Sequence, residues 1–319
     1  MSNVLKVIFA GTPEFAAIQL SVILSKHIVV GVLTQPDRAV GRGQQVTCNP
    51  VKKIALKHNI RIFQPRNINQ ETLHQQLSAL NADIMVVVAY GTKLPNNLLN
   101  ITRFGSINLH CSLLPRWRGS SPIQQAILSG DLSTGVTIIQ MKDKIDNGDI
   151  LNQIACPIDS VDTTATLLNK LSCLGTRGLL STLEQFVHNT ISPTKQIELR
   201  ATYAKKIAKE EAYIDWKLSA CEIERRIRAF NPWPGCYFII NGKYIKVWQA
   251  SILWSYLEGS QYQPGEILHV SNNGIKIATG QAILNIEKLQ LAGKKSMIVS
   301  EFIKARKHWF RRGLIIGCK

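Results

Sequence analysis

The first half of the sequence alternates short apolar runs with stretches of helical character, and this alternation restricts the fold more than any other feature. The run Asp83–Ala89 is apolar after its first residue, as expected for a strand buried on both faces of a parallel sheet. Similar runs occur at Val4–Ala10, Ile28–Leu33, Ser106–His110 and Val136–Gln140. Strands that alternate with helices predict an α/β domain with a doubly wound, mostly parallel sheet. In such a domain, the ligand binds beyond the carboxyl ends of the strands.

The pattern changes near residue 190, which predicts two domains. Beyond this point a helical stretch, Ala220–Phe230, ends in a proline-rich segment, and short strands then recur around the turn at Asn241-Gly242. A last helix is expected over Met297–Trp309. The expected division is 1–189 for the α/β domain, 190–204 for a linker and 205–319 for a small β-barrel of the oligonucleotide-binding type.

Residues 35–49 interrupt the alternation. They include two close glycines together with Arg38 and Arg42, and they lack an apolar period. This composition predicts an exposed, mobile insertion between a strand and a helix of the sheet.

The chain is strongly basic, with a net charge of +17. The charge is uneven: residues 1–203 hold 19 Lys and Arg against 12 Asp and Glu, whereas residues 204–319 hold 19 against 9. The positive electrostatic potential of such a chain favours polyanionic partners and points to nucleic acid. A basic surface that only keeps the chain soluble is the simpler interpretation, and the charge by itself does not separate the two.

Several classes of protein are disfavoured by what the sequence lacks. No apolar run reaches the length of a membrane span, and the apolar segment at the N-terminus is too short for a signal peptide. The first strand is followed by Gly11 alone and not by a glycine-rich phosphate motif. The seven cysteines are scattered, with no paired spacing and no cluster of metal-ligand type. We therefore expect a cytoplasmic protein without a metal and without membrane association.

Asn108, His110 and Asp146 are the strongest candidates for catalysis. Asn108 and His110 lie two residues apart at the end of a strand, so their side chains project from the same face. Asp146 begins Asp-Asn-Gly-Asp, which follows a neighbouring strand. Taken singly, a structural histidine and an ordinary hairpin turn are the simpler interpretations. Together the three side chains suit direct acyl transfer between nitrogens. Cys111 is a possible nucleophile, but it points to the opposite face and suits the core better.

Longer stretches carry a family resemblance. They are FAGTPEFA, TQPDRAVGRG, VVVAYG, INLHCSLLPRWRGSSPIQQAI, TGVTIIQM, IDNGDIL, KEEAYIDW and RAFNPWPG. In this order and spacing, from about Val4 to Trp309, they resemble the methionyl-tRNA formyltransferases. The resemblance implies a folate-dependent one-carbon transferase. This enzyme would move a formyl group from 10-formyltetrahydrofolate, as co-substrate, to the methionine amine of initiator methionyl-tRNA during translation initiation.

The resemblance also implies roles for individual residues. The catalytic Asn-x-His and the Asp of the family fall on Asn108, His110 and Asp146. The folate-binding residues fall on Ser112, Leu113, Leu114 and Pro115, with the pteridine ring near Val88, Ala89 and Tyr90. The basic insertion that contacts the tRNA acceptor stem falls on the segment with Arg38 and Arg42. A monomer without a protein partner is the family expectation.

Three further points stay open at the level of sequence. Lys205, Lys206 and Lys209 are candidate contacts to the tRNA backbone, or else they form a solvated helix face. Asp146 either accepts the amine proton or only supports His110. A formyl transferase acting on a sugar-nucleotide amine or on a glycinamide ribonucleotide, or a non-catalytic RNA-binding protein with a degenerate enzyme domain, remains an alternative.

Overall fold

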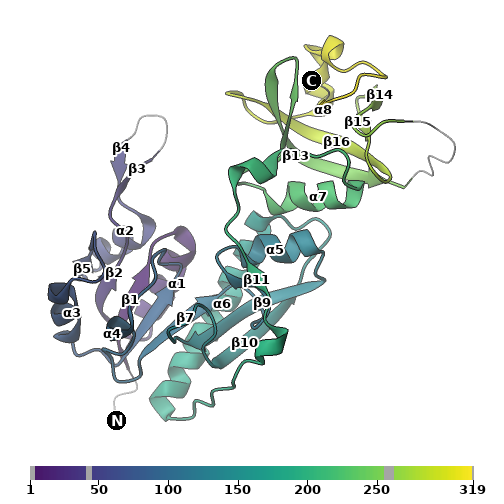
Figure 1. The fold of residues 1–319 in the computed structure, drawn as a ribbon. Helices are drawn as coiled ribbons and strands as arrows, with labels where there is room; N and C mark the ends of the chain where they lie inside the picture. The colour runs from purple at the N-terminus through teal and green to yellow at the C-terminus, as the bar shows by residue number, and fades with distance from the viewer. Residues whose placement is uncertain (1–3, 41–44, 255–261, 318–319) are drawn as a thin grey trace. The chain divides into compact units, whose positions relative to one another are not determined.

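A computed structural model of the chain describes residues 4–40, 45–254 and 262–317 (Figure 1). The chain divides into two compact units, and each combines segments that are separate in the sequence. The first unit is formed by Met1–Pro122, Ser133–Pro157 and Leu168–Ala204, and the second by Ile123–Leu132, Ile158–Leu167 and Lys205–Lys319.

The first unit is built on a seven-stranded sheet. In their order across the sheet the strands are β10 (Ile150–Pro157), β9 (Ser133–Gln140), β7 (Ser106–His110), β6 (Ile84–Val88), β1 (Lys6–Gly11), β2 (Ile28–Leu33) and β5 (Ile62–Phe63). The five strands from β7 to β5 run parallel, and β9 and β10 pair antiparallel at the other edge. The expected mostly parallel α/β sheet is therefore confirmed.

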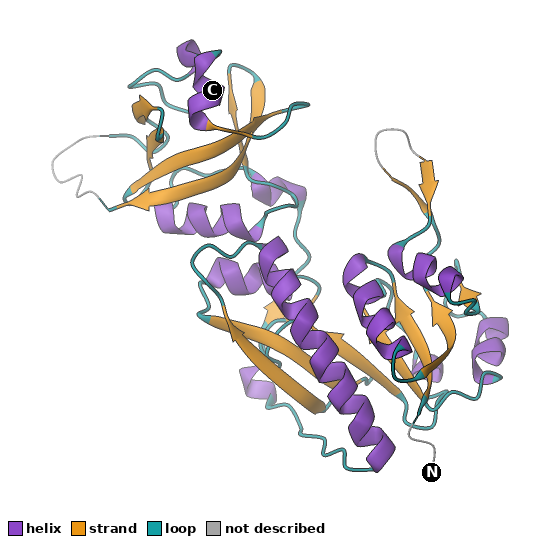
Figure 2. Ribbon diagram, turned by 180° about the vertical axis from the view of Figure 1, so that it is seen from behind, coloured by secondary structure: helices purple, strands orange, loops and turns teal. Residues whose placement is uncertain are grey.

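Helices cover both faces of this sheet, because its central strands are apolar on both sides. All residues of β6 are buried. On one face of the sheet, Ile8 and Met85 share an apolar cluster with residues of the helices α3 and α4. On the other face lie α1 and α6, which are joined by a hydrogen bond from the Gln19 side chain to the Ser172 carbonyl (3.1 Å). Figure 2 shows the long α6 crossing the sheet. The helices are α1 (Glu14–Leu24), α2 (Pro50–Lys57), α3 (Glu71–Ser78), α4 (Asn96–Leu99) and α6 (Thr164–His188).

The second unit contains an antiparallel sheet that forms a half-barrel, in agreement with the barrel expected from the sequence. Its strands, in spatial order, are β12 (Tyr237–Ile240), β13 (Lys243–Leu253), β16 (Ile283–Leu291), β15 (Gly274–Ala278) and β14 (Ile267–Ser271), with β17 (Met297–Ile298) paired to β16. The helices are α5 (Pro122–Ser129), α7 (Ala220–Ala229) and α8 (Val299–Lys304), with 3₁₀ turns η2 (Lys209–Ala212) and η3 (Lys307–Trp309). Helix α7 begins at a capping box in which Ser219 and Glu222 satisfy each other's backbone amides.

The C-terminal helix is shorter than predicted. A helix was expected over Met297–Trp309, but Met297 and Ile298 instead pair as β17 with Leu289 and Lys288 of β16. Because their backbone groups extend the sheet, the helix begins only at Val299 and ends at Lys304.

The insertion at 35–49 also differs from expectation, because it contains regular structure. Strands β3 (Arg38–Val40) and β4 (Gln45–Thr47) form an antiparallel pair. Strands of three residues are too short to show an alternation of apolar residues, so the sequence carries no signal for them. At the base of the hairpin, Asp37 accepts hydrogen bonds from Lys52 (2.5 Å) and Gln64 (3.0 Å), which hold the hairpin to its neighbours.

Candidate active site

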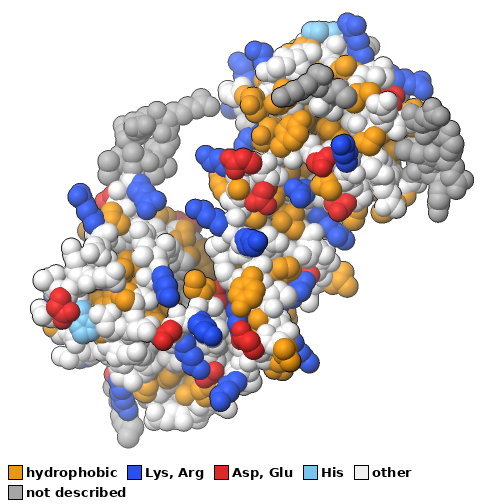
Figure 3. All heavy atoms as spheres, in the orientation of Figure 1, with side chains coloured by type: hydrophobic (Ala, Val, Ile, Leu, Met, Phe, Trp, Pro, Cys, Tyr) orange, Lys and Arg blue, Asp and Glu red, His pale blue; other side chains and the backbone are white. Residues whose placement is uncertain are grey.

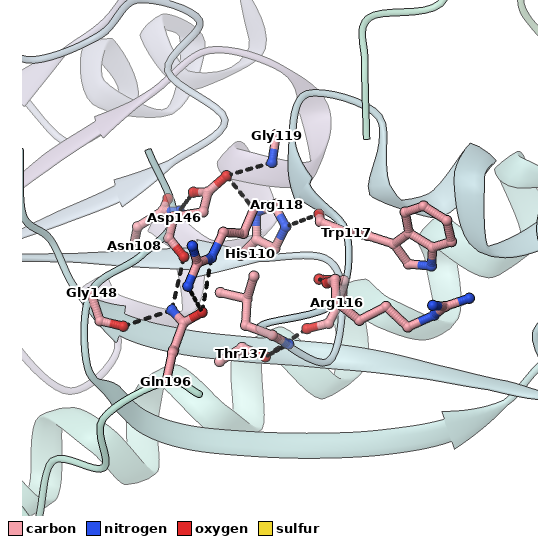
Figure 4. Close-up of polar contacts among 12 residues, drawn as sticks. Asn108, His110, Arg116, Trp117, Arg118, Gly119, Thr137, Asp146, Gly148 and Gln196 are labelled. Atoms are coloured by element: carbon pink, nitrogen blue, oxygen red, sulfur yellow. Dashed lines mark hydrogen bonds and ion pairs between the residues drawn. The ribbon is translucent and has the colours of Figure 1, made fainter. Parts of the chain in front are cut away.

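The candidate site lies where β7 ends, between β6 and β9. Leu109 faces α6, since a Cβ added at Gly175 of that helix would lie 2.8 Å from the Leu109 side chain. Asn108 and His110 project from the opposite face and meet Asp146, which lies between β9 and β10 (Figure 4). The alternation of a strand thus gathers the three predicted catalytic side chains at a carboxyl edge of the parallel sheet.

Asp146 is the centre of this arrangement. One carboxylate oxygen, Oδ1, accepts a long hydrogen bond from Asn108 Nδ2 (3.4 Å). The other, Oδ2, accepts from the backbone N–H of Gly119 (2.8 Å) and lies 3.5 Å from His110 Nδ1. The side chains of His110 and Asp146 are only 7% and 12% exposed, so the pair is largely shielded from water.

The imidazole of His110 lies between two groups that can only accept hydrogen bonds. Its Nδ1 faces the Asp146 carboxylate, and its Nε2 lies 2.9 Å from the carbonyl oxygen of Trp117. The ring can donate to both only when both nitrogens carry a hydrogen, that is, as the imidazolium. The site therefore suits a positively charged His110 beside a negatively charged Asp146.

Three loop residues around the site have left-handed backbone conformations. These are Ala89 after β6 (φ 46°), Trp117 (φ 63°) and Asp146 (φ 53°). Such conformations are costly for residues other than glycine and often cluster at functional sites. Gly148 allows the Asp146 turn to approach β9, because a Cβ there would collide with the carbonyl oxygen of Gln140.

The loop predicted to bind folate is held tightly against β9. The hydroxyl of Thr137 donates to the Ser112 carbonyl (2.6 Å) and accepts from the Leu114 amide (3.1 Å). Gln153 of β10 donates to the Leu114 carbonyl (3.0 Å). Ser112 and Leu114 are buried, whereas Leu113 and Pro115 are half-buried and line the surface of the loop. The loop is therefore a preformed surface beside His110.

Comparison with protein families decides what kind of protein this is. Residues 2–183 match the family described as formyl transferase, and residues 206–307 match the formyl transferase C-terminal domain. The chain belongs to the formyl transferase family. The two matched segments follow each other along the chain, and Asn108, His110 and Asp146 lie in the first of them.

Solved structures of formyl transferases have the same fold. WlaRD, a sugar 3N-formyl transferase in the presence of dTDP and 5-N-formyl-THF, is 22% identical with a TM-score of 0.65, covering 91% of this chain and 99% of its own. The N-formyltransferase from Helicobacter canadensis in complex with folinic acid and dTDP-3-aminofucose is 21% identical with a TM-score of 0.66, covering 88% and 99%.

A third similar structure is longer than this chain. HypX from Aquifex aeolicus in complex with tetrahydrofolic acid is 15% identical with a TM-score of 0.62, over 94% of this chain and 47% of its own. The chain thus spans about half the length of the HypX chains that it matches. At these levels of identity, all three structures establish the fold alone.

Two of the predicted binding residues share a cavity of about 210 Å³. Tyr90, predicted near the pteridine, and Arg38, predicted to contact tRNA, both line it, together with Arg66 and Pro36. Burial raises the pKa of Tyr90 to about 12, so its hydroxyl stays protonated and can donate. Val88 ends the buried strand β6, and Ala89 (φ 46°) connects it to Tyr90, which lines the cavity. Arg42 lies outside the described residues.

The lysines predicted to contact tRNA begin the second unit. Lys205 and Lys206 are exposed in an irregular segment, and Lys209 is exposed in η2. Lys205 and Lys206 thus lie outside any helix and Lys209 begins a short 3₁₀ turn, and the exposure of all three fits either a tRNA contact or a solvated surface. Figure 3 shows further Lys and Arg side chains spread over both units on the face that it draws.

Gln196, Arg118 and Glu198 are a part of the site that sequence reasoning missed. Gln196 donates to the carbonyl oxygens of Asp146 (2.8 Å) and Gly148 (2.7 Å) and accepts from Arg118 (Figure 4). Arg118 also donates to Glu198 (2.8 Å). Gln196 and Glu198 belong to the segment 190–204, which was interpreted as a linker and lies in the first unit. Arg116 and Arg118, which follow His110 closely, could have indicated a polar network at the site. Nothing in the sequence, however, pairs Arg118 with Gln196 and Glu198, which lie about 80 positions away.

Cys111 is not suited to nucleophilic chemistry. Burial raises the pKa of its thiol to about 12, so almost none of it is thiolate near neutral pH. Over the part of the chain that the structure describes, no group of His, Cys, Asp and Glu side chains could hold a metal ion. Within the same ranges, no helix combines the length and apolar character needed to cross a membrane.

Proposed function

We propose that this chain transfers the formyl group of 10-formyltetrahydrofolate to the amino group of methionine on initiator methionyl-tRNA. The observation that carries the proposal is the arrangement of Asn108, His110 and Asp146, which meet within 3.5 Å in a largely buried site of a formyl transferase fold. Transfer of an acyl group between two nitrogens needs an amide donor, an imidazolium and a carboxylate.

In the proposed reaction, the neutral amine attacks the formyl carbon directly and a tetrahedral intermediate forms. Asn108 has a second amide N–H besides the one facing Asp146, and this N–H donates to the developing oxyanion. His110 adds a positive charge nearby, and its long contact to Asp146 (3.5 Å) leaves the Nδ1 hydrogen available to the same oxygen. The folate nitrogen then leaves, taking the proton that Asp146 removed from the amine, so that no net proton is gained or lost.

Asp146 removes the proton that the attacking amine loses, directly or through a water molecule. Its Oδ2 accepts a fixed hydrogen bond from Gly119, and among the residues that the structure describes its Oδ1 has only the long contact to Asn108. Oδ1 is thus the oxygen with remaining capacity to accept. The same carboxylate lies 3.5 Å from His110 Nδ1, so one residue serves both as a base and as the neighbour of the imidazole.

Folate as the formyl donor is supported from two sides. The preformed loop Ser112–Pro115 and the strand end Val88–Tyr90 flank the catalytic residues, as the resemblance to methionyl-tRNA formyltransferases implies. Proteins of the same fold have also been solved with folate compounds: HypX with tetrahydrofolic acid, and two sugar N-formyltransferases with 5-N-formyl-THF and with folinic acid.

Initiator tRNA as the acceptor is supported by charge and by the sequence resemblance. Residues 204–319 hold 19 Lys and Arg against 9 Asp and Glu, which suits a polyanion. Lys205, Lys206 and Lys209 would contribute affinity that falls with salt, and the insertion with Arg38 and Arg42 would contact the acceptor stem.

A sugar-nucleotide amine is the second candidate acceptor, because the similar WlaRD and Helicobacter canadensis structures are sugar N-formyltransferases. The deciding assay offers labelled 10-formyltetrahydrofolate with one of three amines: methionyl initiator tRNA, methionyl elongator tRNA or a dTDP-amino sugar. We expect strong transfer to the initiator alone. Transfer to the sugar alone would replace our proposal with the second candidate, and no transfer to any of the three would refute both.

The tRNA contact is tested separately with Arg42→Ala and a matched control, Arg177→Ala, in which the arginine is exposed on α6. We expect Arg42→Ala to raise the KM for tRNA and leave folate binding unchanged, while the control changes neither. Equal loss of tRNA and folate binding would instead give Arg42 a structural role.

A further inference from the structure

We propose that Gln196, held in place by Arg118 and Glu198, is a positioning residue that fixes the Asp146 turn for formyl transfer. The inference rests on the proposed function for its chemistry, but not on the identity of the amine. It concerns a residue from the segment 190–204, far in sequence from the strand ends that carry Asn108 and His110.

The first observation is that Gln196 joins the two ends of the turn. Its side-chain amide donates to the carbonyl oxygens of Asp146 (2.8 Å) and Gly148 (2.7 Å). Asp146 has the left-handed conformation (φ 53°), which is unfavourable for an aspartate that lacks compensating contacts. The two hydrogen bonds close this turn from the side opposite the carboxylate.

The second observation is that the orientation of the Gln196 amide is determined. Arg118 Nε and Nη2 both donate to Gln196 Oε1, at 3.1 and 3.0 Å. Because a guanidinium has no acceptor, the oxygen of the amide must face Arg118, and the NH₂ group must face the turn. Arg118 itself is 2% exposed and makes a bidentate pair with Glu198 (2.8 and 2.9 Å), which supplies its counter-charge.

The third observation is that the same segment also fixes the donor to the carboxylate. Strand β11 (Tyr203–Ala204) pairs in parallel with β8 (Arg118–Gly119). The Arg118 amide donates to the Thr202 carbonyl (2.8 Å), and the next residue, Gly119, donates its N–H to Asp146 Oδ2 (2.8 Å). The segment therefore holds Asp146 twice, by its carbonyl through Gln196 and by its carboxylate through β8.

Small shifts of Asp146 matter because its contacts to the other catalytic residues are already long. Asn108 and His110 lie 3.4 and 3.5 Å from its oxygens, so a displacement outward would break both contacts. A misplacement of about 1 Å in a catalytic group can cost about 10²-fold in rate. We therefore expect loss of the Gln196 amide to lower kcat by about 10- to 100-fold, with little change in KM.

Two substitutions separate positioning from folding. Gln196→Glu keeps an oxygen for Arg118 but removes both N–H donors to the turn, and Gln196→Met removes the whole polar group. The matched control is Gln75→Leu, a glutamine that is exposed on α3. Thermal unfolding establishes that each variant is folded, and kcat, both KM values and the pH dependence of kcat are then measured with the best amine.

A readout independent of turnover is the ring-nitrogen NMR signal of His110, assigned by its loss in His110→Gln. If Gln196 positions Asp146, this signal shifts in both Gln196 variants and not in Gln75→Leu, and the pH profile of kcat moves with it. Folded Gln196 variants with the original kcat, pH profile and His110 signal would overturn the inference. Absence of formyl transfer by the unsubstituted chain, with the His110 shift present, would instead refute the proposed function alone.

Discussion

Replacing Asp146 with asparagine tests the assignment of the site most directly. The substitution keeps the size of the side chain but removes the charge 3.5 Å from His110 Nδ1. The introduced amide must keep its oxygen toward the Gly119 N–H, so its NH₂ group faces Asn108 in place of Oδ1. Asn108 then has to turn its own oxygen inward, which removes its amide N–H from the developing oxyanion.

The expected loss follows from the geometry. At 3.5 Å, the interaction of two unit charges is about 4–5 kcal/mol for an effective dielectric constant of about 20, which suits a pair that is mostly shielded. Losing this interaction, and with it the proposed base and the Asn108 donor to the oxyanion, corresponds to a decrease of about 10³-fold or more in kcat. Single-turnover transfer of labelled formyl groups at saturating substrate measures the chemical step.

Asp149→Asn is the matched control, because Asp149 belongs to the same Asp-Asn-Gly-Asp turn but pairs with Lys142 (2.9 Å). An exposed ion pair of this kind contributes at most about 1 kcal/mol. We expect the kcat of Asp149→Asn to stay close to that of the unsubstituted chain. A kcat for Asp146→Asn within tenfold of the control would refute both the charge pairing and the role of Asp146 as the base.

Three further results are expected. Asn108→Ala and His110→Ala each lower kcat by about 10²–10³-fold with folate binding retained in equilibrium titrations, and near-normal turnover of either would contradict the oxyanion assignment. Cys111→Ala leaves kcat unchanged, and thiol reagents near pH 8 leave this cysteine unmodified by mass spectrometry, because its pKa is about 12. Hydrogen bonding from Lys52 lowers the pKa of Asp37, so the ionised carboxylate stabilises the folded chain. Asp37→Asn therefore reduces the free energy of unfolding at pH 7. In denaturant titrations, this difference between the variant and the unsubstituted chain disappears as the pH falls below about 4.

The part of the site that sequence could predict depends on local geometry. Side chains two apart on a strand share a face, so Asn108 and His110 were expected together, and the structure places them so. Asp146 was predicted from its place after a neighbouring strand, which in a sheet of this type is close in space. The α/β fold followed from the alternation of apolar runs with helical stretches, because an unbroken apolar run of this length is typical of a strand buried on both faces.

Contacts between distant segments were beyond such reasoning. Gln196 and Glu198 lie in a segment without apolar periodicity, and their role depends on a buried guanidinium that reaches them across about 80 residues of sequence. A polar side chain in a loop has the same appearance in sequence whether it faces solvent or satisfies a buried carbonyl. The same holds for the short strands β3 and β4, whose pairing comes from backbone hydrogen bonds alone.

The left-handed backbone of Asp146 explains why the site needs these distant contacts. A non-glycine residue in such a conformation costs about 1–3 kcal/mol, and leaving its carbonyl without a donor would add about 1–3 kcal/mol more if the group is buried. Glycine at this position would remove the first cost but also the carboxylate on which the proposed chemistry depends. An aspartate can therefore persist there only if other residues hold its turn, and the hydrogen bonds from Gln196 to the Asp146 and Gly148 carbonyls do so. Strain at the proposed catalytic carboxylate and its compensation by the segment 190–204, as we infer, are thus two parts of one arrangement.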